Sequence, residues 1–385
     1  MRVNLSKAGL LAFCLAAVTC CNTALAQVTY KLHRVPLANV NNASDFNSTG
    51  MNNLGLAIGL HELGGVTHGF VYDHYGLLGA AKTTHTLTEW MDIPAGWDSK
   101  CVGLNDVGQV VGAFERTTAL GTQQEGFLLD LGLFSGTPSW RFLPKPAGAL
   151  SSYGRKINNN GLILIQADIP INQGVYTDQY VYDSSNPNAE LVHLMETRIM
   201  RFMDINDSRQ FSGFNGVRLT LNSELGIQEM LTVPGVAGYT SINTHGMLGL
   251  QLKETRDSRG RLITPNLAAR YSDTAGVVKL STVNSGVWDI NDSGDVCGFK
   301  GTANSPAIYT DKDGWLDLKD RVTGNPNDVG MWLAAGERKL KYIANRPKLD
   351  ASGFGNLYAI AVLATKQGKN TTYDVRHFLL EPVLP

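Results

Sequence analysis

"SGVWDINDSGDVCGFKGTANSPAIYTDKDGWLDL", residues 285–318, contains four short apolar runs that are separated by turn residues. The first run ends in Asn-Asp-Ser-Gly, and these residue types accept the backbone angles of a tight hairpin. Short apolar runs joined by hairpins predict a four-stranded antiparallel sheet in this stretch. Less regular copies of the same pattern occur along the rest of the chain.

The repeated unit has an anchor, an Asn or Asp at the end of an apolar run and usually three residues before a Gly. Seven anchors can be aligned: Asn52, Asn105, Asn158, Asn206, Asn243, Asn291 and Asp350. Their spacings are 53, 53, 48, 37, 48 and 59 residues. Seven four-stranded units predict an all-β fold, a seven-bladed β-propeller of four-stranded antiparallel blades. A right-handed β-helix is the alternative, but it would need shorter coils with rungs in register.

The two ends of the chain predict how the ring closes. The last unit has a second strand at residues 356–364 and a third strand at 376–382, and no fourth strand follows. Residues 29–35, "TYKLHRV", read like the fourth strands of the other units. We therefore expect the N-terminal strand to complete the last blade.

Composition and the first residues indicate the class of protein. The 385 residues are 43% hydrophobic and 17% charged and include 41 Gly, which is typical of a turn-rich β protein. The net charge of −1 argues against nucleic-acid binding. Residues 1–26 read as a signal peptide, with Arg2 and Lys7 before an apolar run and "ALA" at 24–26. We expect a secreted or periplasmic protein whose residues 27–385 form one domain. A lipoprotein cleaved at Cys20 or Cys21 is the alternative, although neither follows the usual small residue.

The motifs also resemble a known family. "INDSG", then Val-x-Gly, then a "HAF"-like strand that ends in Tyr-Asp or Leu-Asp, is similar to the extracellular HAF-repeat proteins of bacteria, as is the ending "RHFLLEPV". The resemblance covers nearly the whole mature chain and implies secretion and a propeller-like fold. It implies no single activity. Unlike many members, this sequence has no anchor segment after the last repeat, so we expect a released protein.

Metal and cofactor sites are not expected. The mature chain keeps only Cys101 and Cys297, which could form one disulfide or remain two buried thiols. The stretch that starts at Asp289 begins like an EF-hand loop, but Lys300 stands where a bidentate Glu is needed. No His-Glu-x-x-His, paired Cys-x-x-Cys or phosphate loop is present.

The distribution of basic residues gives the functional hypothesis. Loops between second and third strands gather on one face of a propeller together with the links between blades, and here these segments are rich in Arg and Lys. Solvated loop charges are the plain explanation, and an anion-binding surface is the alternative. For a secreted protein without a phosphate motif, we expect an acidic polysaccharide as the partner. We also expect no membrane anchor and a monomer. The predicted substrate-binding residues are Arg198, Arg201, Arg256, Arg259 and Tyr153.

Two functions fit this hypothesis. A polysaccharide lyase needs a cation to neutralise the uronate carboxylate and a His or Tyr as base, and some lyases of uronic-acid glycans are seven-bladed propellers. The catalytic candidates are His61, Tyr176 and Arg218. His61 is chosen because it lies outside the repeat pattern, unlike His68 and His377. The alternative function is a non-catalytic glycan-binding or adhesion module.

Overall fold

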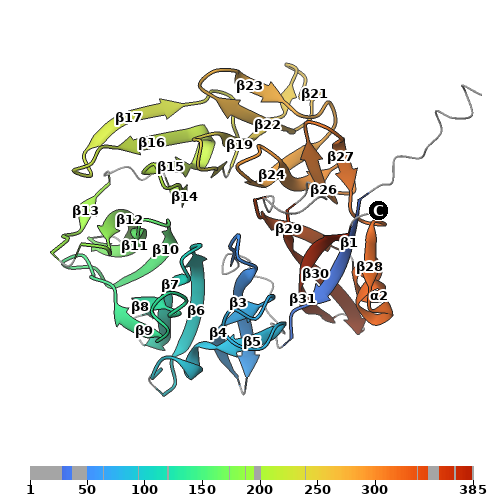
Figure 1. Ribbon diagram of the computed structural model, residues 1–385. Helices are drawn as coiled ribbons and strands as arrows, with labels where there is room; N and C mark the ends of the chain where they lie inside the picture. The colour runs from blue at the N-terminus through green and yellow to red at the C-terminus, as the bar shows by residue number, and fades with distance from the viewer. Residues whose placement is uncertain are drawn as a thin grey trace, which may run out of the picture.

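Seven sheets, antiparallel except for one strand pair at the edge of blade 7, surround a central channel in the computed structural model, which confirms the predicted β-propeller (Figure 1). The structure describes residues 28–36, 50–63, 65–93, 95–118, 121–172, 174–186, 188–194, 201–238, 240–335, 337–345, 355–367 and 370–383. The predicted signal peptide lies outside these residues. Among them, no helix has the length and apolar character needed to cross a membrane.

Blades 1 to 4 each contain four strands that follow one another from the centre outward. Blade 1 consists of β2 (Gly50–Met51), β3 (Leu56–Leu63), β4 (Val66–Asp73) and β5 (Thr83–Thr86), followed by the short helix η2 (Leu87–Glu89). Blade 2 consists of β6 (Asp98–Leu104), β7 (Gln109–Thr118), β8 (Gly121–Asp130) and β9 (Ser139–Phe142). Blade 3 consists of β10 (Ser151–Ile157), β11 (Leu162–Ile171), β12 (Gly174–Asp183) and β13 (Val192–His193). Blade 4 consists of β14 (Phe202–Ile205), β15 (Gln210–Gly213), β16 (Val217–Leu221) and β17 (Ile227–Thr232), with η3 (Phe214–Gly216) before β16.

Blades 5 to 7 add small insertions to this plan. Blade 5 consists of β18 (Ser241–Ile242), β19 (Leu248–Leu252), β22 (Leu267–Ser272) and β23 (Gly276–Lys279), with the hairpin β20 (Thr255–Arg256) and β21 (Leu262–Thr264) between β19 and β22. Blade 6 consists of β24 (Ser285–Ile290), β25 (Val296–Lys300), β26 (Ser305–Thr310) and β27 (Gly314–Asp317). Blade 7 consists of β29 (Glu337–Ile343), β30 (Leu357–Gln367), β31 (Asn370–Val383), β1 (Thr29–Arg34) and β28 (Val322–Gly324), with helix α2 (Pro326–Ala334) between β28 and β29.

The predicted closure of the ring is confirmed. β1 pairs antiparallel with β31, from Thr29 opposite Val383 to Arg34 opposite Phe378. Its outer edge pairs in parallel with β28, a fifth strand that the sequence did not predict. The first and last strands of the chain therefore lie side by side in one sheet (Figure 1).

The anchor turns explain the repeated motif. The turn glycine is left-handed, as at Gly294 with a φ of +78°, whereas in blade 4 Arg209 takes a φ of +59° in its place. The anchor Asn has a different role from the one that the hairpin pattern suggested. Asn158 Oδ1 accepts the backbone N–H groups of Asn160 and Leu162, and its Nδ2 donates to the carbonyl oxygen of Asn206, the anchor of the next blade. Each of the six anchor asparagines thus fixes its own turn and connects neighbouring blades.

The seventh anchor was predicted wrongly. The carbonyl oxygen of Ala344 accepts the Asn291 amide, as an anchor does, and the Ala344 N–H donates to the carbonyl oxygen of Asn356. Asp350 itself lies outside the described residues. Because alanine has no side-chain amide, the sequence pattern does not mark this position.

Apolar side chains fill the interfaces between blades. Leu56 and Ile58 of blade 1, for example, are buried in one cluster with Val110 and Phe127 of blade 2. The two cysteines belong to different blades and are both buried free thiols, so the predicted alternative of a disulfide is wrong. Burial raises the pKa of both thiols, which keeps them protonated and unreactive.

Candidate functional site

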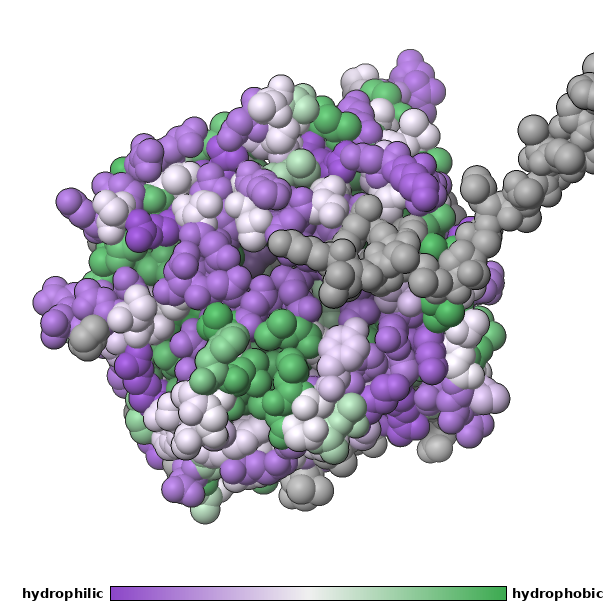
Figure 2. All heavy atoms as spheres, viewed as in Figure 1, coloured by the Kyte–Doolittle hydropathy of each residue, from purple (hydrophilic) through white to green (hydrophobic). Residues whose placement is uncertain are grey.

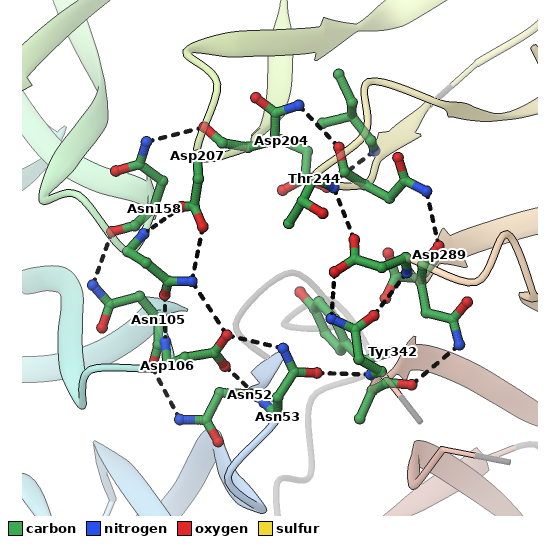
Figure 3. A pocket seen from close by; sticks show the side chains of 18 of the residues that line it. Asn52, Asn53, Asn105, Asp106, Asn158, Asp204, Asp207, Thr244, Asp289 and Tyr342 are labelled. Carbon is green, nitrogen blue, oxygen red and sulfur yellow. Dashed lines mark hydrogen bonds between the residues drawn. The ribbon is translucent and has the colours of Figure 1, made fainter. Parts of the chain in front are cut away.

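The residues that follow the anchors form a ring around the channel mouth (Figure 3). The backbone N–H of Asn53 donates to Asp106 Oδ1 at 2.8 Å, and Asp106 donates in the same way to Asn159 at 2.8 Å. The Asn345 N–H donates to Asn53 Oδ1 at 2.7 Å, which joins blade 7 to blade 1. The same kind of hydrogen bond joins blades 1 to 4 and blades 5 to 7, so the main role of these residues is structural.

Four titratable side chains lie one layer deeper in the channel, each two positions before its anchor. Lys156 Nζ is 3.5 Å from Asp204 Oδ1 and 4.9 Å from the centre of the Tyr342 ring. Asp289 Oδ2 accepts the backbone N–H of Ile343 at 3.1 Å. Burial, together with the nearby Asp204 charge, raises the pKa of Asp289 to about 7. For Lys156, burial lowers the pKa, but Tyr342, Asp204 and Asp289 outweigh it and raise the pKa above the ordinary value.

Acidic residues predominate among the charged side chains that line the channel. Its cavity of about 170 Å³ is lined by five aspartates and one lysine: Asp106, Asp204, Asp207, Asp289, Asp292 and Lys156. Hydrophilic side chains gather around the centre of the ring in Figure 2, apart from the part that grey atoms cover. A polyanion would be repelled from this channel. The expectation that an acidic glycan binds over the channel therefore finds no support in its charge.

Asp289 gives a prediction on stability and pH. Its pKa is about 7 in the folded protein and near 3.8 in the unfolded chain, so the folded state binds the proton more tightly. This contribution to stability is complete below about pH 4 and is lost as the pH rises to about 7. We expect Asp289→Asn to match the wild type in urea unfolding at pH 4 and to exceed it by about 1–3 kcal/mol at pH 8. A variant that is less stable than the wild type at pH 8 would show that the Asp289 charge is needed by Lys156.

His61, one of the three catalytic candidates, lies at the end of β3 and is 3% exposed. Its ring centre is 5.6 Å from that of His68 and 6.4 Å from that of Phe70, both in the neighbouring strand. Burial lowers its pKa, so the imidazole is neutral at pH 7. The sequence placed His61 where the second strand enters a loop, but the structure encloses it within blade 1.

Arg218 was assigned to a loop on the basic face, and this assignment is wrong. It belongs to β16, is 2% exposed, and donates two hydrogen bonds from Nη2 to the Asp273 carboxylate at 2.9 and 3.0 Å. Its Nη1 donates to the carbonyl oxygen of Gly246. Arg270 of blade 5 repeats this arrangement with Gly294 and Asp311 of blade 6. Arg218 therefore links blades 4 and 5, and its guanidinium already pairs with the Asp273 carboxylate.

The remaining predicted residues are spread over several blades. Tyr176 lies in β12 of blade 3, opposite Ile169 of β11. Tyr153 lies in β10, with its hydroxyl 3.2 Å from Arg155 Nη1. Arg201 is exposed before β14, and Arg256 and Arg259 are exposed in the β20–β21 hairpin, where Arg256 pairs with Glu254. Arg198 lies outside the described residues. The catalytic candidates His61, Tyr176 and Arg218 thus belong to blades 1, 3 and 4.

A groove between blades 6 and 7 was missed by the sequence analysis. It has a volume of about 450 Å³ and is lined by Trp288, Phe299, Ala303, Asn304, Ser305, Pro306, Lys319, Arg338 and Lys339. Three of these residues are cationic and none is acidic. Trp288 is 36% exposed, and Lys341 Nζ lies 4.7 Å from the centre of its ring.

The fold holds the groove residues in place. Trp288 occupies a β-bulge in β24, where the pairing with β25 shifts between Val287 and Asp289. A bulge re-aims a side chain, which here turns the indole away from the regular pleat. Arg338 donates from Nε and Nη2 to the carbonyl oxygens of Trp332 and Leu333 at the end of α2. Trp288 sits next to the "DINDSG" motif, but nothing in the sequence signals that β29 brings Arg338 and Lys339 beside it.

Comparisons with known proteins add no family or activity. No protein-family model and no curated protein matches the chain. Among solved structures, it is similar to the β-propeller domain of the Trilobed protease from Pyrococcus furiosus, with 12% identity over 75% of this chain and 82% of that chain and a TM-score of 0.44. It is also similar to the acylaminoacyl peptidase of Pyrococcus horikoshii, with 11% identity, coverage of 84% and 51%, and a TM-score of 0.46. It is similar as well to Porphyromonas gingivalis dipeptidyl peptidase 4, with 9% identity over 80% of this chain and 49% of that chain and a TM-score of 0.42. The alignment thus spans about half the length of the last two proteins, and likenesses at this level carry no argument about activity.

Proposed function

We propose that this protein is a secreted or periplasmic, non-catalytic module that binds an acidic polysaccharide in the groove between blades 6 and 7. The observation that carries the proposal is the lining of this groove, an exposed tryptophan with three cationic residues and no carboxylate. The sequence features that support export are the signal-like residues 1–26 and the resemblance to HAF-repeat proteins.

The groove chemistry suits a uronic-acid sugar. The C–H face of a pyranose ring packs against an aromatic face, and the Trp288 indole offers such a surface. A uronate carboxylate pairs with ammonium or guanidinium groups, which Lys319, Arg338 and Lys339 provide. The exposed position of this groove also suits a chain ligand that continues beyond one sugar.

The lyase function that the sequence suggested first has less support. β-Elimination needs a base and a carboxylate-neutralising cation at one sugar, within about 3 Å of the reacting groups. His61 and Arg218 are each buried in a different blade, and Arg218 already neutralises Asp273. We therefore favour binding without catalysis.

Affinity measurements on groove variants test the proposal. We expect the protein to be retained on immobilised alginate or pectate at low salt and to elute at moderate salt, because such contacts are screened within about 10 Å at 0.1 M. Trp288→Ala and Lys339→Ala should each weaken binding about tenfold, the typical effect of losing one stacking or charge-assisted contact of about 1–1.5 kcal/mol.

Arg259→Ala is the matched control, since it removes one exposed positive charge from the β20–β21 hairpin and leaves the groove intact. Its binding should equal that of the wild type. If Arg259→Ala weakens binding as much as Lys339→Ala does, diffuse charge rather than the groove holds the glycan. An increase in ultraviolet absorbance on incubation with uronic-acid polysaccharides would reveal unsaturated products and restore the lyase function.

A further inference from the structure

Three side chains that are distant in sequence meet where the ring closes. His33 lies in β1, the first strand of the chain, and Glu381 lies in β31, the last strand. His74 follows β4 of blade 1. The cluster therefore joins the N-terminal strand, the C-terminal strand and the neighbouring blade at a single point.

The donor atoms converge. His33 Nε2 is 2.8 Å and His74 Nε2 is 3.7 Å from the same oxygen, Oε2 of Glu381. The three donor atoms all lie within 4.8 Å of one another. Ligand atoms on a tetrahedral zinc ion are separated by about 3.3 Å, given Zn–N bonds of about 2.0 Å. These separations therefore need only small side-chain rotations to match a metal ion.

The surroundings hold the two imidazoles in place. His33 is 9% exposed and His74 is 1% exposed, whereas the Glu381 side chain is 36% exposed. The Tyr72 hydroxyl is 3.4 Å from His74 Nδ1, so the other ring nitrogen, Nε2, faces the carboxylate. Such a partner on the second nitrogen is typical of metal-binding histidines. Burial lowers the pKa of both rings, which favours the neutral form that binds metals.

The donor set selects the class of metal. Two imidazoles and one carboxylate suit Zn²⁺ and similar transition metals, whereas Ca²⁺ and Mg²⁺ prefer oxygen ligands. The positive charges of Lys31 and Lys82 act on His33 and would also repel a cation bound beside it. Electrostatic attraction alone would therefore hold an ion poorly at this position. Directed bonds from imidazole nitrogen are needed to hold a cation here.

We propose that His33, His74 and Glu381 form a transition-metal site, specific for Zn²⁺ over Ca²⁺ and Mg²⁺, that fastens the seam at which the propeller closes. A bound ion would connect β1 and β31 of blade 7 with blade 1. Metal binding to the folded chain would then stabilise the closed ring by mass action.

Metal titration of the mature chain tests this proposal. After treatment with a chelator, calorimetry should find one Zn²⁺ per chain, and Co²⁺ should give the intense visible bands of a low-coordinate site. A hundredfold excess of Zn²⁺ over its Kd should raise the melting temperature by about 3 °C. His74→Ala should weaken Zn²⁺ binding at least about 100-fold and abolish this rise, because losing a ligand costs more than the 10- to 100-fold of an outer-shell partner.

His85→Ala is the matched control. His85 is also paired with a carboxylate, Glu89 at 2.9 Å, but does not belong to the three-residue cluster. Its Zn²⁺ affinity should equal that of the wild type. If His74→Ala lowers the melting temperature of the metal-free protein, Glu381→Gln tests the site instead, because it keeps the size of the side chain and creates no cavity. Equal Zn²⁺ binding by the wild type, His74→Ala and Glu381→Gln, or no binding by the wild type at micromolar Zn²⁺, would overturn the proposal.

Discussion

A chain that lacks residues 28–35 is expected to lose the cooperative unfolding of the intact protein. The deletion removes β1, whose Tyr30 and Leu32 are buried with Phe378 and Trp332 in one apolar cluster. It also leaves β31 without the partner along its outer edge. Burying Tyr30, Leu32 and Val35 contributes about 5–9 kcal/mol, which is comparable with the whole free energy of unfolding of a typical domain. An exposed strand edge of this length also promotes aggregation.

Urea denaturation followed by circular dichroism, together with size-exclusion chromatography, measures this effect. The control is a chain that begins at residue 28 and so keeps β1. A synthetic peptide of residues 28–36, added to the truncated chain, should restore part of the transition, because an unpaired edge accepts a strand in trans. A truncated chain that unfolds at the same urea concentration as the control would refute closure by β1 as the source of stability.

Gly298→Ala is expected to destabilise the protein by about 3 kcal/mol or more, an effect of overpacking. Gly298 is the glycine of the Val-x-Gly motif in β25, and it faces the bulge of β24. A Cβ at this position would lie 1.9 Å from the carbonyl oxygen of Gly286, which is backbone and cannot rotate away. Gly112 of blade 2 has the same relation to Lys100, so Gly112→Ala should show the same loss.

Gly330→Ala is the control for this prediction. Gly330 lies in α2, and a Cβ there would have no atom within 4 Å. Alanine is favoured over glycine in a helix, so this variant should gain about 0.5–1 kcal/mol. Urea unfolding of the three variants checks both signs at once. If Gly298→Ala retains wild-type stability, the close approach of β24 to β25 is not a constraint.

Much of the architecture could be predicted from local pattern. Alternating apolar runs and Asn-x-x-Gly turns place most strands, and the missing fourth strand of the last unit predicts that β1 completes blade 7. The prediction failed at the seventh anchor, where Ala344 supports the turn through its backbone and leaves no recognisable side chain. It also did not foresee β28, a three-residue strand that pairs in parallel along the edge of β1.

The candidate site was less predictable. Sequence reasoning expected a basic loop face, and it assigned Arg218 to one of these loops as a cation that would neutralise a uronate carboxylate. The structure instead buries this arginine against Asp273, 55 residues later, in a clamp that Arg270 repeats one blade further on. Conversely, the groove was not predicted, because nothing in the sequence indicates that Trp288 lies beside Arg338 and Lys339.

The sequence by itself determined the strands, the turns and the number of blades, because these depend on residues within a few positions of one another. Only the tertiary structure decided which side chains meet. The ring brings His33 within 2.8 Å of Glu381, although 348 residues separate them. Similarly, the bulge in β24 and the start of β29 together form the groove. Blade order, strand register and bulges set these distances, and the chemistry of a site depends on distance rather than on position in the chain.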